Sequence, residues 1–87
     1  MKELKYEIPI YPDNNPKVFK AACARLERAY PRLKKGRLLV DVDGSTIQIY
    51  RLDGKEIIIY DDYDVGAVVA MADVDISAAL RRPIDKA

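Results

Sequence analysis

The sequence has no histidine, no tryptophan and only one cysteine among its 87 residues. Without histidine, the chain cannot build Ser-His-Asp or Cys-His catalysis, or an imidazole ligand for a metal ion. The single thiol, Cys23, excludes an internal disulfide and a CxxC zinc site, and it is typical of a reducing compartment. These absences exclude several common designs of hydrolase, zinc protein and disulfide-stabilised domain.

Long apolar runs are missing as well. No uncharged stretch approaches the roughly 18 residues of a membrane span, and the charged start MKELKYEIPIY is unlike a signal peptide. We therefore expect a cytoplasmic protein. With 49% hydrophobic and 33% charged residues, a chain of this length is expected to form a single domain over residues 1–87.

The formal net charge of +1 hides an uneven distribution along the chain. Residues 1–40 hold ten Lys and Arg against four Asp and Glu, whereas residues 41–87 hold five against ten. The contrast is sharpest between residues 17–37, at +7, and residues 41–75, at −7. The sequence thus predicts a basic side and an acidic side.

The first part of the chain predicts a strand followed by a helix. Residues 4–11 alternate as a half-buried strand does, and Pro9, which lacks a donor N–H, predicts a sheet edge or a bulge. Asn15 suits an N-cap and Pro16 the first helical position, so we expect a helix from Pro16 to about Tyr30. Its predicted apolar stripe consists of Phe19, Ala22, Cys23, Leu26, Ala29 and Tyr30.

The remaining chain predicts an antiparallel sheet. Alternating segments at 38–42, 46–52 and 55–60 are separated by Asp43-Gly44 and Asp53-Gly54, dipeptides typical of tight hairpin turns. The uncharged segment 65–72 is compatible with a strand or a buried helix. We favour a strand, because Gly66 and the valines are poor helix formers, and we expect it inside the sheet or covered.

These elements combine into an α+β fold. A last helical turn is expected at 78–82, capped by Ser77. The predicted order is β-α-β-β-β-β: a two-layer domain with one amphipathic helix packed on a mainly antiparallel sheet of four to five strands.

The string from Leu38 to Thr46, which contains Asp41-Val42-Asp43-Gly44, resembles the first motif of the haloacid dehalogenase superfamily. The resemblance implies a nucleophile at Asp41, a general acid/base at Asp43 and a bound magnesium ion. That fold needs a chain more than twice as long and has its motif strand at the start. Because the string here follows a helix and precedes an alternating segment, we interpret it as a hairpin turn.

The acidic half of the chain contains the candidate partner-binding site. Tyr63 lies among carboxylates in Asp61-Asp62-Tyr63-Asp64, and strand ends are expected to bring further carboxylates to the same rim. Carboxylates steer association with a basic partner, and a tyrosine side chain fills a pocket on it. The predicted partner-binding residues are Asp53, Asp61, Asp62, Tyr63, Asp64, Asp73 and Asp75.

In its small size, its 61–64 cluster and its closing run Asp73-Val74-Asp75-Ile76-Ser77, the chain is similar to small bacterial toxin-immunity proteins and phage-type inhibitors. In those proteins an acidic rim neutralises a toxin or nuclease. The resemblance implies a non-enzymatic antitoxin-like inhibitor of a basic protein partner, acting without a cofactor or a metal.

The basic helix face supports an alternative, a small nucleic-acid-binding or regulatory domain. The residues that would contact phosphates are Lys17, Lys20, Arg25, Arg28 and Arg32. No aromatic residue accompanies them on the helix, and the acidic half would repel a long polyanion. The protein-binding hypothesis is therefore preferred.

Overall fold

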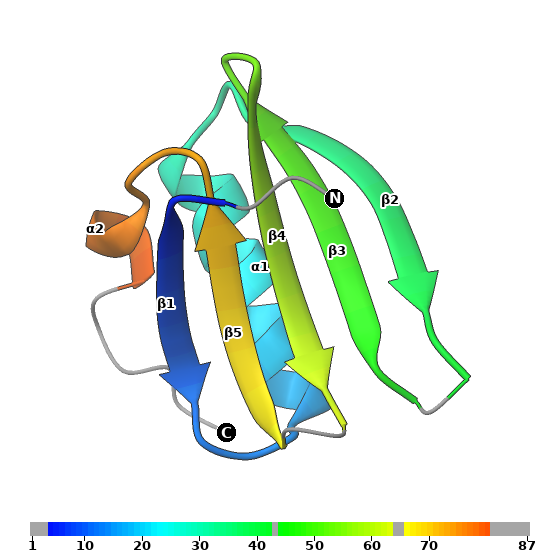
Figure 1. Ribbon diagram of the computed structural model, residues 1–87. Helices are drawn as coiled ribbons and strands as arrows, with labels where there is room; N and C mark the ends of the chain where they lie inside the picture. Colours follow the sequence, from blue (N-terminus) through cyan, green and yellow to red (C-terminus); the bar gives the residue numbers. More distant parts are fainter. Residues whose placement is uncertain (1–3, 43, 64–65, 81–87) are drawn as a thin grey trace.

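A computed structural model describes residues 4–42, 44–63 and 66–80. The chain forms a five-stranded antiparallel sheet with strand order β1-β5-β4-β3-β2, and helix α1 covers one face (Figure 1). The elements are β1 (Tyr6–Tyr11), α1 (Pro16–Ala29), β2 (Lys34–Val40), β3 (Thr46–Leu52), β4 (Lys55–Asp62), β5 (Ala67–Ala72) and α2 (Ser77–Leu80). The predicted α+β fold and element order are confirmed.

Helix α1 begins where the sequence predicts. The Asn15 side chain accepts hydrogen bonds from the backbone N–H groups of Lys17 and Val18, at 3.0 and 3.1 Å, and Pro16 occupies the first turn. The helix ends at Ala29, because Tyr30 takes an extended conformation before Pro31. The N-cap prediction is confirmed, and the helix is one residue shorter than expected.

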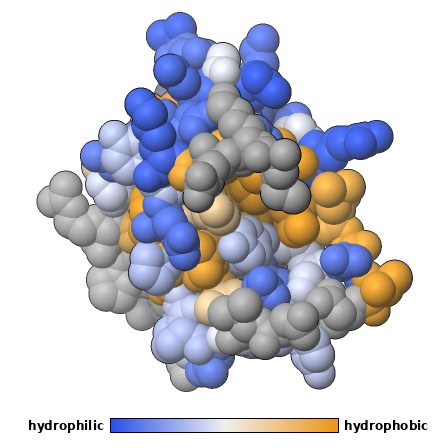
Figure 2. Space-filling model, viewed as in Figure 1, coloured by the Kyte–Doolittle hydropathy of each residue, from blue (hydrophilic) through white to orange (hydrophobic). Residues whose placement is uncertain are grey.

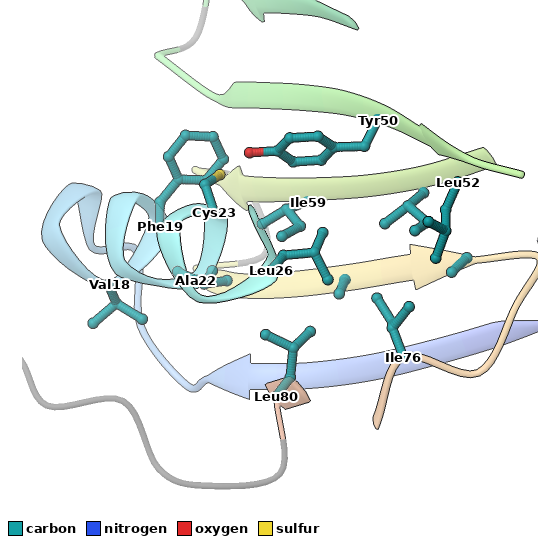
Figure 3. Close-up of a cluster of buried hydrophobic side chains, with 14 residues drawn as sticks. Val18, Phe19, Ala22, Cys23, Leu26, Tyr50, Leu52, Ile59, Ile76 and Leu80 are labelled. Atoms are coloured by element: carbon teal, nitrogen blue, oxygen red, sulfur yellow. The ribbon is translucent and has the colours of Figure 1, made fainter. Parts of the chain in front are cut away.

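The core lies between α1 and the sheet (Figure 3). From α1 it contains Val18, Phe19, Ala22, Cys23 and Leu26, and from the sheet Tyr50, Leu52, Ile57, Ile59, Val68, Ala70 and Ala72. Ile76 and Leu80 add to the core on the side where α2 packs against α1. The predicted stripe was wrong for Ala29, which is exposed, and it omitted Val18, which is fully buried.

The ambiguous uncharged segment forms a strand, as favoured. β5 lies between β1 and β4 and pairs with both, so its backbone N–H and C=O groups are satisfied on each side. An apolar strand can occupy this position without exposing an edge. Val65, the first residue of the predicted segment, lies outside the described residues.

The two edge strands are β1 and β2, and each has an irregularity. The register of β1 shifts between Pro9 and Tyr11, which confirms the edge and bulge positions predicted from Pro9. The register of β2 shifts between Lys35 and Leu38. The buried Gln48 side chain supports this second bulge, since its amide donates to the carbonyls of Gly36 and Arg37 at 3.2 and 3.1 Å.

The chain reverses at the predicted turns. Asp53 and Gly54 both have positive φ, 50° and 81°, as a primed hairpin turn requires. α2 begins at Ser77 itself, one residue earlier than predicted, and the Asp75 carboxylate accepts hydrogen bonds from the Ser77 N–H (3.0 Å) and Oγ (2.6 Å). The last two residues of the predicted turn, 81–82, lie outside the described residues. No helix in the described part of the chain is long and apolar enough to cross a membrane.

Candidate protein-binding site

Several turns meet at the end of the sheet where β1, β2 and β4 finish (Figure 1). The Tyr63 N–H donates to Ser45 Oγ at 2.9 Å, which joins the chain after β4 to the β2–β3 hairpin. The Asp61 carboxylate joins β4 to the turn between β1 and α1, because it accepts hydrogen bonds from Asn14 and Asn15. We use the name acidic end for Asp13, Asp41, Asp62 and Tyr63, which lie in or beside the turns at this end of the sheet.

Tyr63 is the most exposed aromatic side chain of the acidic end. Its side chain is 61% exposed. The residue before it, Asp62, ends β4 and is half-buried. Asp13 and Asp41 lie on neighbouring turns and are exposed. Asp64, the fourth residue of the predicted cluster, lies outside the described residues. Within the described part of the cluster, the exposed ring of Tyr63 and the half-buried Asp62 lie at this surface.

Asp61 does not belong to this surface. It is only 3% exposed, and its Oδ1 accepts hydrogen bonds from the Asn14 side-chain amide (2.7 Å) and the Asn15 N–H (3.0 Å). Alternation along β4 turns it toward the α1 side of the sheet, together with Ile57 and Ile59. The expectation that Asp61 lies on the binding rim is wrong, because its carboxylate holds the turn that leads into α1.

Asp53, Asp73 and Asp75 lie at the opposite end of the sheet. β4 separates Asp53 from Asp62 by eight residues of extended chain, which span roughly 25 Å. Asp53 pairs with Arg32 at 2.7 Å, the Asp73 N–H donates to the Glu56 carbonyl at 3.0 Å, and the Asp75 carboxylate accepts from the Ser77 N–H at 3.0 Å. The single continuous rim expected from the sequence is therefore wrong, because consecutive turns of an antiparallel sheet alternate between its ends.

Basic side chains gather on α1 and at this opposite end. Lys17, Lys20 and Arg28 are exposed on α1, and Arg25 is half-buried. Beyond the helix, a depression of about 520 Å³ is lined by Arg32, Lys34, Arg51, Asp53 and Gly54. The structure thus extends the predicted basic face, although the carboxylate of Asp53 lies inside the depression and pairs with Arg32.

A groove between α1 and β2 was not predicted. It measures about 410 Å³, and its lining includes Phe19, Cys23 and Leu38. At its border the Tyr50 hydroxyl donates to Glu27 Oε2 at 2.5 Å, and Lys35 Nζ lies 3.5 Å from the same oxygen. No sequence motif links these residues, because they come from α1, β2 and β3 and meet only through folding.

The buried polar groups beside this groove are uncharged. Burial raises the pKa of the Cys23 thiol, and burial together with the hydrogen bond to Glu27 raises the pKa of the Tyr50 hydroxyl. In Figure 3 the Tyr50 hydroxyl points toward Cys23 and Phe19. A thiol with a raised pKa is a poor nucleophile at neutral pH, so Cys23 behaves as a core residue.

Strand β2 carries an exposed hydrophobic surface. Leu38, Leu39 and Val40 are 56%, 42% and 70% exposed, and Val42 just beyond them is fully exposed. Figure 2 views the sheet from the face opposite α1 and shows hydrophobic surface across the sheet and along the β2 side. Alternation in the sequence marked an apolar face here, but it did not indicate that this strand would be an edge.

The dehalogenase-like string forms a hairpin. β2 and β3 pair antiparallel, and the Asp41 N–H donates to the Ser45 carbonyl at 2.8 Å, which confirms the turn predicted for it. Asp43 lies outside the described residues. Across the described positions, no group of three Asp, Glu or Cys side chains is arranged to hold a metal ion. Comparisons with protein-family models, with curated proteins and with solved structures find no match to this chain.

Proposed function

We propose that this protein is a cytoplasmic, non-enzymatic protein-binding module, an immunity or inhibitor protein that neutralises a basic partner such as a toxin nuclease. The observation that carries the proposal is the exposed ring of Tyr63 at the acidic end, beside Asp62. Tyrosine is enriched in protein interfaces, where it buries a large rigid ring and keeps a polar tip. Carboxylates around such an anchor favour a cationic partner.

The acidic end is held in place by the fold. The Tyr63 backbone is bonded to Ser45, and the turn before α1 is bonded to the buried Asp61. Each contact joins segments far apart in the sequence and so restrains the position of Tyr63 and of the turn before α1. A preorganised surface loses little conformational entropy on binding, which favours affinity.

The mechanism follows from this geometry. The exposed carboxylate of Asp13, together with Asp62 beside Tyr63, steers a basic cleft toward the acidic end before contact. Tyr63 then enters the cleft, and the sheet behind it blocks access for the partner's own substrate. Inhibition by occlusion requires no catalytic group on this chain.

The test identifies the partner and then measures its affinity. Immobilised protein retrieves binding proteins from a lysate of the native host, and each retrieved protein is purified and titrated by calorimetry. We expect a basic protein whose dissociation constant rises at least about tenfold with Tyr63→Ala, as for an anchor residue. Asp62→Lys should lower the association rate and weaken its dependence on salt.

Asp53→Ala is the matched control, because Asp53 lies at the opposite end of the sheet. It should leave the affinity unchanged. An unchanged dissociation constant for Tyr63→Ala, or an equal loss with Asp53→Ala, would remove the acidic end from the proposal. Retrieval of no protein, or only of acidic proteins, would contradict the proposed function itself.

The alternative function, nucleic-acid binding, is favoured by one observation. The exposed Lys17, Lys20 and Arg28 of α1 lie on the same helix that leads toward the depression lined by Arg32, Lys34 and Arg51. The ion pair between Arg32 and Asp53 lowers the positive charge of that depression. Protein binding therefore remains the preferred proposal.

A further inference from the structure

Strand β2 is an edge whose outer side is open. All seven of its residues are exposed, and Leu38, Leu39 and Val40 form an uninterrupted apolar run. The opposite edge, β1, differs, because Pro9 removes a donor from its centre and its register shifts there. Natural sheets usually protect a long edge with proline, charge or a covering element. The first half of β2 has charged residues and a register shift, but the run from Leu38 to Val40 has no such protection.

The backbone of β2 has hydrogen-bonding groups directed outward at defined positions. The Asp41 N–H donates to the Ser45 carbonyl, so the backbone groups of Asp41 point toward β3. The register is regular from Leu38 to Val40, and the backbone groups of Leu39 therefore point toward β3 as well. In an antiparallel strand, the backbone N–H and C=O groups of successive residues point alternately toward one neighbouring strand and toward the other side. The N–H and C=O groups of Leu38 and Val40 therefore point away from the sheet, where a further strand would bind.

The two ends of β2 carry opposite charges, so two copies of this strand placed antiparallel would bring opposite charges together. Basic residues Lys34, Lys35 and Arg37 precede the apolar run, and Asp41 follows it. We propose that β2 pairs antiparallel with β2 of a second copy of this chain, around a two-fold axis at Leu39, to form one continuous sheet. In this register Arg37 lies opposite Asp41 of the second copy, twice, and Leu38 lies opposite Val40.

Other registers satisfy fewer constraints. A shift by one residue would place outward-facing backbone groups opposite inward-facing ones. A two-fold axis at Leu38 keeps the hydrogen bonds and places Lys35 opposite Asp41, but it sets Arg37 opposite Leu39. An axis at Val40 places Leu39 opposite Asp41. Only the axis at Leu39 joins the apolar residues and pairs the charges at both ends of the run.

The groove beside β2 fits this arrangement. α1 does not cover Leu38, which lines the groove and remains 56% exposed on the helix side of the sheet. Residues opposite one another in an antiparallel pair point to the same face. Val40 of the second copy would therefore cover Leu38 at the mouth of the groove, and both α1 helices would lie on one face of the joined sheet.

The experiment uses two single charge reversals whose effects should cancel when the variants are mixed. Arg37→Glu and Asp41→Lys each place like charges opposite one another in a homodimer, but in a mixed dimer every charged pair is again opposite in sign. Sedimentation equilibrium should show the parent at twice the mass of one chain, with the dissociation constant raised more than about tenfold in each variant. An equimolar mixture should regain the dimer.

Glu7→Lys on β1 is the control, because it reverses an exposed charge on the other edge strand. It should dimerise as the parent does, and circular dichroism with urea unfolding should show all variants folded. A monomeric parent, or single variants that dimerise unchanged, would overturn the proposal. Failure of the mixture to dimerise would overturn the register at Leu39. These readouts of mass do not depend on the partner proposed for the acidic end.

Discussion

Asp61 and Asp62 are adjacent in the chain and have opposite roles, because β4 turns successive side chains to opposite faces of the sheet. Asp61 points to the buried side, where its carboxylate accepts hydrogen bonds from Asn14 and Asn15. Asp62 points to the other face and leads to the exposed Tyr63. The local sequence shows two equivalent acids, and only the pairing of β4 distinguishes them.

Replacing Asp61 should therefore destabilise the fold. In Asp61→Ala, the Asn14 amide and the Asn15 N–H lose their acceptor in a partly buried site, so we expect the free energy of unfolding to fall by about 1–3 kcal/mol. Urea unfolding measures this difference. Asp13→Ala, an exposed change in the same turn, should stay within about 0.5 kcal/mol of the parent. Equal stability of the two variants would show that the buried carboxylate does not hold the turn.

At the scale of elements, β2 combines a bulge with an open edge. The Gln48 amide holds the carbonyls of Gly36 and Arg37, and Gly36 lies close against β3. The bulge ends where the regular run from Leu38 begins, so it sets the position of the outward-facing backbone groups. An irregularity within one monomer thus determines which residues a second strand can reach.

Gly36→Ala should disturb this element. The added Cβ would lie 3.0 Å from the Ile49 carbonyl oxygen, a contact so tight that β2 and β3 must move slightly apart at this point. We expect a loss of roughly 1–3 kcal/mol in the free energy of unfolding, as for other overpacked sites. Lys34→Ala, an exposed change on the same strand, provides the control by urea unfolding. A Gly36→Ala variant as stable as Lys34→Ala would show that β2 tolerates the shift without cost.

At the scale of the molecule, the formal charge of +1 is distributed over distinct surfaces. Lys17, Lys20 and Arg28 line α1, whereas Asp13 and Asp41 lie at the acidic end. At the other end of the sheet, Asp53 forms an ion pair with Arg32. A protein partner can match this pattern better than a long uniform polyanion can.

Binding to nucleic acid should accordingly be weak. Fluorescence anisotropy with a labelled single-stranded DNA and a duplex RNA should show no binding at physiological salt, and at most a salt-sensitive association at low salt. The variant Lys20→Glu/Arg28→Glu tests whether any such binding uses α1. Affinity that persists at physiological salt in the parent and is lost in this variant would favour the nucleic-acid alternative over the protein-binding proposal.

The sequence by itself determined the elements of this fold, because their signals are local. The Asn15-Pro16 start of α1, the two Asp-Gly turns and the alternation in β3 and β4 all depend on residues a few positions apart. Pro9 indicated a sheet edge or a bulge, since it lacks a backbone donor, and β1 has both. Tyr63, which the sequence singled out by its acidic neighbours, is exposed, and its role as an anchor stays a prediction.

The tertiary structure decided which turns share an end of the sheet and which strand has an open side. Strand order placed Asp53 and Asp62 at opposite ends, buried Asp61 and left Leu38, Leu39 and Val40 uncovered. It also brought Glu27 to Tyr50 and Lys35. These features depend on pairing between segments distant in the chain. Alternation along one strand shows which residues share a face, but it does not show what packs against that face.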